Sequence, residues 1–178
     1  WTVRLSGFAR RITNYVTLQP TSISPLLPLS PETVFHYVNG DATFVGAEAS
    51  GQWAVADPVT VRASGSWLWG RDDRLDEPAL GVAPLQGRLG ARWRLPVSGQ
   101  SLSRLYLDGT LRAVARQDRV AETRGETATD GYATVALTAG ARFWRRLELE
   151  AGVENLFDVT VANHLNANNP FRGVRVPE

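Results

Sequence analysis

The 178-residue sequence contains no cysteine, no methionine and no lysine, so all 19 of its basic residues are arginine. Without cysteine there is no disulfide, no thiolate nucleophile and no Cys-ligated zinc. Without methionine or cysteine, the chain also lacks the soft ligands that suit a copper ion. No apolar stretch approaches the roughly 18 residues of a membrane-spanning helix. The first residue is Trp1 rather than methionine, which predicts that the chain begins inside a longer protein.

Signs of a nucleic-acid partner and of catalysis are also missing. The net charge is +1 and the arginines are scattered, with no run longer than a pair, which argues against nucleic-acid binding. The phosphate-binding, metalloprotease and nucleophile-elbow motifs are absent. We therefore predict no catalytic residue, no metal site, no cofactor and no enzymatic activity. His36 and His164 are expected to be exposed loop residues.

Alternation of apolar and polar residues dominates what is present. In "LQGRLGARWRL", Leu85, Leu89 and Trp93 fall on one face of an extended strand, and the arginines between them fall on the other. A less clean phase near Arg10 predicts a β-bulge in the first strand. The runs of this kind lie at residues 2–18, 42–55, 59–69, 85–95, 104–116, 132–143 and 147–157.

The lengths of the runs and of the links between them predict a membrane barrel. Each run has about the ten residues that a tilted strand needs to cross a bilayer. Short and long links alternate strictly, as do the short periplasmic turns and long extracellular loops of transmembrane β-barrels. We predict an all-β, antiparallel, up-and-down transmembrane barrel segment of about seven long strands. Single-chain bacterial barrels have even strand numbers, so a last strand is expected to be missing.

The charged residues decide which face of the strands is wet. An arginine on the lipid face costs about 2–4 kcal/mol at the bilayer midplane, so the charged face must line the interior and pair arginines with carboxylates across strands. Aromatic residues near strand ends on the other face, such as Trp67 and Trp93, predict interfacial girdles. The residues expected to face the lumen or a plug are Glu48, Arg62, Arg88, Arg92, Asp108, Arg112, Arg116 and Glu150.

A polar corner, "GVENLFD", ends the last alternating run. Asn155 and Asp158 are expected to close side-chain-to-backbone hydrogen bonds as the strand leaves the membrane. Leu156 and Phe157 are expected to anchor at the interface, so we interpret the set as structural. Its members are Gly152, Asn155, Leu156, Phe157 and Asp158.

This corner resembles the penultimate-strand signature of the TonB-dependent outer-membrane receptors, and "YVNGDATFVGAEASGQW" is similar to a frequent strand opening of that family. The "HLN" at 164–166 and the closing "VPE" look most like the copper-receptor branch. The resemblance implies that residues 1–178 are the C-terminal part of a receptor barrel in the outer membrane of a Gram-negative bacterium. The plug domain, N-terminal in that family, would be absent from these residues.

The function that the resemblance implies is uptake of a scarce nutrient such as a metal chelate. The expected partners are the receptor's own plug, the TonB complex, outer-membrane lipid and the small-molecule ligand. Two other interpretations stay open at this stage. One is a small porin-like or structural outer-membrane barrel, and the other is a soluble β-sandwich binding module, which would have shorter strands.

Overall fold

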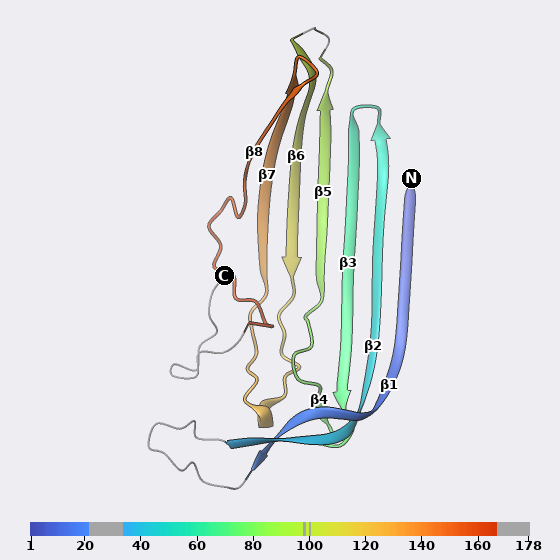
Figure 1. Ribbon diagram of the computed structural model, residues 1–178, viewed down its shortest axis with the longest axis vertical. Helices are drawn as coiled ribbons and strands as arrows, with labels where there is room; N and C mark the ends of the chain where they lie inside the picture. Colours follow the sequence, from blue (N-terminus) through green and yellow to red (C-terminus); the bar gives the residue numbers. More distant parts are fainter. Residues whose placement is uncertain (22–33, 98, 100, 167–178) are drawn as a thin grey trace.

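A computed structural model describes residues 1–21, 34–97, 99 and 101–166, and these form a single antiparallel sheet (Figure 1). The strands run in sequence order across the sheet, and only β4 lies off this path, paired with β3. Their bounds are β1 (Thr2–Thr21), β2 (Val34–Ala56), β3 (Val59–Asp72), β4 (Glu77–Pro78), β5 (Gln86–Leu95), β6 (Leu102–Val114), β7 (Tyr132–Phe143) and β8 (Leu147–Val153). The predicted all-β, up-and-down architecture is confirmed. Among the described residues β1 and β8 are the two edges, so the sheet is open.

Several strand boundaries and the bulge differ from the prediction, and β8 ends at Val153 rather than at residue 157. β2 begins at Val34 rather than at residue 42, because the β1–β2 hairpin continues past the membrane-length portion of its strands. β6 ends at Val114 rather than at residue 116. The register of β1 shifts between Ile12 and Tyr15, where Asn14 adopts φ 58°, and not at Arg10. Asn tolerates this left-handed conformation, so it accommodates the one extra residue that β1 has at the bulge.

The connections segregate to opposite ends of the sheet, as the alternation of link lengths predicts (Figure 1). Residues 57–58, 96–101 and 144–146 connect strands at one end, here called the short-turn end. The adjoining ends of β1 and β2, the connections 73–85 and 115–131 and residues 154–166 lie at the other, here called the long-loop end. Within 115–131, Glu122–Arg124 form a single 3₁₀ turn, η1. No helix in the described residues has the length and apolar character to cross a bilayer.

Large apolar side chains are exposed along the odd-numbered face of the strands, here called the apolar face. Leu5, Trp67, Leu89 and Leu149 are each 44–78% exposed. The few buried apolar residues include Ala79, Val82, Val120 and Ala121, which belong to the long loops. The described residues make one layer, whereas a β-sandwich packs two sheets around a shared core. The apolar face therefore suits a surrounding hydrocarbon medium, and the sandwich interpretation is wrong.

Aromatic residues mark the two borders of this face. Trp93 pairs with Val59 near the short-turn end, whereas Trp67 and Trp69 lie eight and ten positions further along β3. At about 3.3 Å per residue this separation is roughly 26–33 Å along the strand. With a tilt of about 40° it becomes roughly 20–25 Å of height, close to the apolar band of outer-membrane barrels.

Candidate functional site on the polar face of the sheet

The opposite, even-numbered face of the sheet, here called the polar face, carries a charge cluster at its centre. The Asp108 carboxylate on β6 accepts hydrogen bonds from Arg62 Nη2 on β3, at 2.6 and 2.9 Å, and from Arg92 Nε on β5, at 2.7 Å. Its side chain is only 10% exposed, while both arginines are about 40% exposed. Three strands thus share one carboxylate, and the predicted cross-strand pairing of arginine with acid is present. One charge of each sign cancels, leaving one net positive charge.

Tyr106 extends this cluster towards β8. Its hydroxyl donates to Glu150, and the Arg92 guanidinium lies 4.4 Å from the centre of its ring. The ring crosses β7 at Gly140, where any Cβ would overlap it. Sequence analysis did not single out Tyr106. Two features of the sequence could have indicated it: an aromatic residue at a polar position of "LYLDGT", and a glycine in the strand that pairs with it. Tyr106 therefore connects a fourth residue that was predicted to face the lumen, Glu150, to the cluster of Arg62, Arg92 and Asp108.

A second group of arginines on the same face has no carboxylate of the described residues within ion-pair distance. The arginine row, Arg4, Arg88 and Arg112, lies along one line of paired residues, with Ser50 and Ser64 between Arg4 and Arg88. Arg88 is directly opposite Arg112, an arrangement that like charges disfavour. The Arg112 guanidinium lies 5.6 Å from the centre of the Tyr132 ring, and its buried Nε has no hydrogen-bond partner among the described residues.

Grooves run along this row. One of about 610 Å³ is lined by Arg4, Arg62 and Arg88 together with Ser50 and Ser64. A neighbouring groove of about 840 Å³ adds Glu48, which faces Ser6 and Ser66 across its two neighbouring strands. The row is thus an accessible set of donors beside hydroxyl groups, suited to carboxylates or other oxyanions.

Arg116 does not belong to this face. It lies beyond the end of β6, where the chain has entered the long loop, and it forms an exposed pair with Asp130 at 3.5 Å. The alternating pattern in the sequence continues through residue 116, but the Gln117–Thr129 bridge replaces sheet pairing there. Placing Arg116 with the wall residues was therefore wrong.

The long loops are held together by a buried arginine that sequence analysis also missed. The guanidinium of Arg124, in η1, is fully buried and lies 3.2 Å from Asp72 and 2.8 Å from Glu77. It also donates to Thr17 on β1 at 2.7 Å and to the Pro78 carbonyl at 2.6 Å. These four groups and Arg124 are here called the loop cluster. The cluster ties the β6–β7 loop to β1, β3 and β4.

His164 is buried beside this cluster, so its expected exposure was wrong. It is only 3% exposed, with Nδ1 2.9 Å from Thr129 Oγ1 and Nε2 3.1 Å from Glu126 Oε1. Glu126 also accepts from the backbone N–H groups of Gly81 and Ala121, at 2.9 and 2.7 Å. The segment after β8 is therefore fastened to the connection 115–131, and Glu126 links that connection to Gly81 of the connection 73–85. Within the described residues, no group of three or more potential ligands could hold a metal ion.

The corner after β8 has the geometry expected for a structural strand exit. The Asn155 side chain exchanges two hydrogen bonds with the backbone of Val159, at 2.9 and 3.0 Å. The bond of Asp158 is made by its backbone N–H, which donates to the Asn155 carbonyl at 2.9 Å, and not by its side chain as expected; both residues adopt positive φ. Gly152 lies against Thr138 of β7, leaving little room for a Cβ. Leu156 and Phe157 remain 41% and 70% exposed, as interface anchors would be.

Comparison with known proteins identifies the fold and the family. The family model described as "TonB dependent receptor-like, beta-barrel" matches residues 1–156. The chain belongs to the TonB-dependent receptor family. Among solved structures, "Copper transporter OprC" aligns with a TM-score of 0.82 over 99% of this receptor chain, at 22% identity. No curated protein sequence matches the receptor chain.

The likeness to the copper transporter shows that the two share a fold. The receptor chain spans 27% of the length of that structure. TonB-dependent receptors are outer-membrane transporters, which fits the exposed apolar face and the charged opposite face described here. The interpretation as a small porin-like barrel is wrong for a chain of this family.

Proposed function

We propose that this receptor chain forms part of the wall of an outer-membrane transporter that takes up a scarce nutrient, such as a metal chelate. The observation that carries the proposal is the separation of faces in a receptor-family sheet. Guanidinium and carboxylate groups occupy one face, and exposed leucine, valine and tryptophan occupy the other. In this arrangement the polar face lines the lumen, the short-turn end faces the periplasm, and the long-loop end faces the medium.

The loop cluster supports a role for the long-loop end in presenting a ligand. Buried ion pairs fix the loops 73–85 and 115–131 against β1, so this rim is organised rather than loose. The 178 residues contain neither methionine nor cysteine, which are the preferred ligands of soft copper ions. We therefore favour a chelated metal, recognised through its organic shell, over a bare soft ion for the part of the site that these residues supply.

Uptake is tested by growth of a strain lacking the full-length gene under metal limitation, with a panel of metal chelates as the only source. One chelate should restore growth only when the full-length gene and an active TonB complex are both present. Rescue by every chelate, or rescue without TonB, would contradict the proposal. The first result would indicate a general pore, and the second would indicate transport that is not coupled to TonB.

The arginine row supports a second part of the proposal, that the wall holds the receptor's own plug. Like-charged Arg88 and Arg112 face one another with no carboxylate of the described residues beside them, and acidic groups of a plug would relieve this repulsion. In the full-length receptor, the double variant R88Q/R112Q should raise the entry of a large antibiotic that the outer membrane normally excludes. R116Q, in the exposed loop, is the matched control. Unchanged leakage and unchanged uptake in the double variant would count against plug retention.

A further inference from the structure

The β7–β8 turn contains a conflict between sequence and backbone. Trp144 and Arg145 both adopt positive φ, 46° and 58°, and the N–H of Arg146 donates to the Phe143 carbonyl at 3.0 Å. This is the geometry of a type I′ turn, for which Asn-Gly is strongly favoured. Positive φ in a bulky residue such as tryptophan is a strained outlier. Such strain persists where the side chains serve a role that the favoured residues would not.

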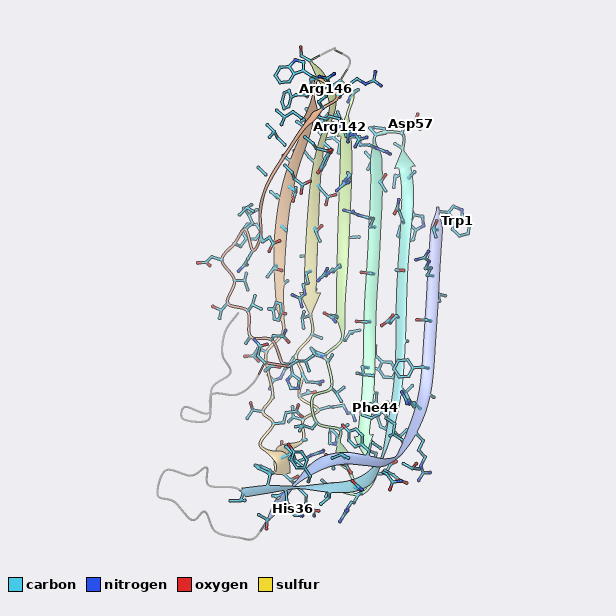
Figure 2. All side chains as sticks on the ribbon, viewed as in Figure 1. Trp1, His36, Phe44, Asp57, Arg142 and Arg146 are labelled. Carbon is cyan, nitrogen blue, oxygen red and sulfur yellow. The ribbon has the colours of Figure 1, made fainter. Side chains whose placement is uncertain are left out.

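The side chains presented by this turn are a ring and two cations. Trp144 is 61% exposed and packs against Phe143 of the apolar face, with ring centres 5.9 Å apart. Arg145 and Arg146 are exposed, and neither forms an ion pair within the described part of the chain. Figure 2 shows Arg146 at the tip of the sheet, with Arg142 just below it and Asp57 at the β2–β3 turn.

The whole short-turn end is cationic. Arginines outnumber carboxylates beside the three short turns, whereas carboxylates outnumber arginines in the connections 73–85, 115–131 and 154–166. The charged residues beside the short turns are Asp57, Arg94, Arg104, Arg142, Arg145, Arg146 and Glu148. Among these described residues only Arg142 has a close partner, Glu148 at 2.8 Å, whereas Arg104 lies 3.9 Å from the same carboxylate and Arg94 bonds weakly to the Asp57 carbonyl at 3.3 Å.

A hollow of about 460 Å³ lies beside two of these arginines. Arg94 and Arg104 line it, and most of its remaining wall is apolar. The apolar side chains come from the β2–β3 and β5–β6 turns and the adjoining strand ends: Pro58, Leu95, Pro96, Val97 and Leu105. Asp57 and Ser103 complete the wall, so one carboxylate as well as two guanidinium groups borders the hollow.

We propose that the short-turn end binds an anionic glycerophospholipid, such as phosphatidylglycerol, from the adjacent leaflet. Trp144 lies at the headgroup level, where tryptophan is enriched, and Arg145 and Arg146 contact the lipid phosphate. Arg94 and Arg104 add positive charge to the same end of the sheet. The charge imbalance between the two ends makes this site specific to the leaflet at the short-turn end. The proposal needs a membrane-inserted barrel but does not depend on which nutrient is transported.

The test uses the purified full-length receptor in a zwitterionic detergent, titrated with phosphatidylglycerol or phosphatidylcholine. Bound lipids are counted by native mass spectrometry. The wild type should bind phosphatidylglycerol more tightly than phosphatidylcholine. R145Q/R146Q should weaken phosphatidylglycerol binding about 25-fold, from about fivefold for each arginine near a membrane surface. R10Q/R11Q, the arginine pair towards the long-loop end, is the matched control and should bind like the wild type.

A second variant separates a lipid role from a structural one. W144N/R145G installs the favoured type I′ sequence, so its thermal stability should equal or exceed that of the wild type. Its affinity for phosphatidylglycerol should nevertheless fall at least about fivefold. The proposal is overturned if this variant or R145Q/R146Q binds phosphatidylglycerol like the wild type. It is also overturned if both lipids bind equally well, or if R10Q/R11Q shows the same loss.

Discussion

Replacing Arg124 with methionine should detach the β6–β7 loop from the sheet. Methionine keeps much of the length of the side chain but removes the charge, and it leaves the Asp72 carboxylate, whose residue is 0% exposed, without a cation. Breaking a buried pair by removing one partner costs about 3–5 kcal/mol. Asp72 keeps hydrogen bonds from the N–H groups of Arg74 and Leu75, both at 3.1 Å. These bonds offset part of the loss, so we expect about 3 kcal/mol.

At about 1.4 kcal/mol per factor of ten, this loss raises the population of the open loop about 150-fold. Limited proteolysis of the full-length receptor in membranes measures that population, because cleavage tracks loop opening when opening is fast. R116M is the matched control in the same loop, since its exposed pair with Asp130 contributes at most about 1 kcal/mol. Adding D72N to R124M should restore part of the protection. Equal cleavage rates for R124M and R116M would refute the assignment of the loop cluster as the anchor.

Three further predictions concern the wall and the corner. G140V should lower barrel stability in urea by about 1–3 kcal/mol, because its side chain displaces the Tyr106 ring; unaltered unfolding would show that Tyr106 does not cross β7. D108N should destabilise the barrel by about 2–4 kcal/mol, since Arg62 and Arg92 lose their shared carboxylate, whereas R94Q serves as a control with only weak hydrogen bonds. N155A should lower the free energy of unfolding by about 1–2 kcal/mol, because it removes two hydrogen bonds at a residue with positive φ. N155D should recover part of this loss, because it keeps the acceptor for the Val159 N–H. Equal unfolding midpoints for N155A and N155D would contradict this role.

The alternating strands were predictable because two environments act on them directly. A residue such as Leu89 faces the opposite medium from Arg88 and Arg92, so position along the strand fixes the face. Membrane thickness sets the strand length, and connection length distinguishes the two ends of the sheet. The charge cluster follows from the same pattern, because neighbouring antiparallel strands bring Arg92 opposite Asp108. The predicted wall residues other than Arg116 therefore lie on one face of the described sheet, and the assignment of that face to the lumen stays a prediction.

The loop contacts were not predictable because no period governs them. Arg124 meets Thr17 across 107 positions of sequence, and nothing local distinguishes Arg124 from an exposed arginine such as Arg116. His164 is buried by Glu126 and Thr129 from another connection. Tyr106 is an intermediate case, because its partner Glu150 lies two strands away and becomes visible only once the facing glycine on β7 is known.

Within the described sheet, the outer edges of β1 and β8 have no partner strand, and this determines which property a destabilising mutation changes first. Each margin presents a row of backbone N–H and C=O groups, and hydrocarbon offers these groups no substitute for a neighbouring strand. In a membrane these two margins of the described sheet need partner strands, which a closed barrel provides. Damage in β3 or β6 should consequently lower the yield of the complete cylinder rather than loosen one wall, and it should appear in cells as lost assembly before it appears as lost transport.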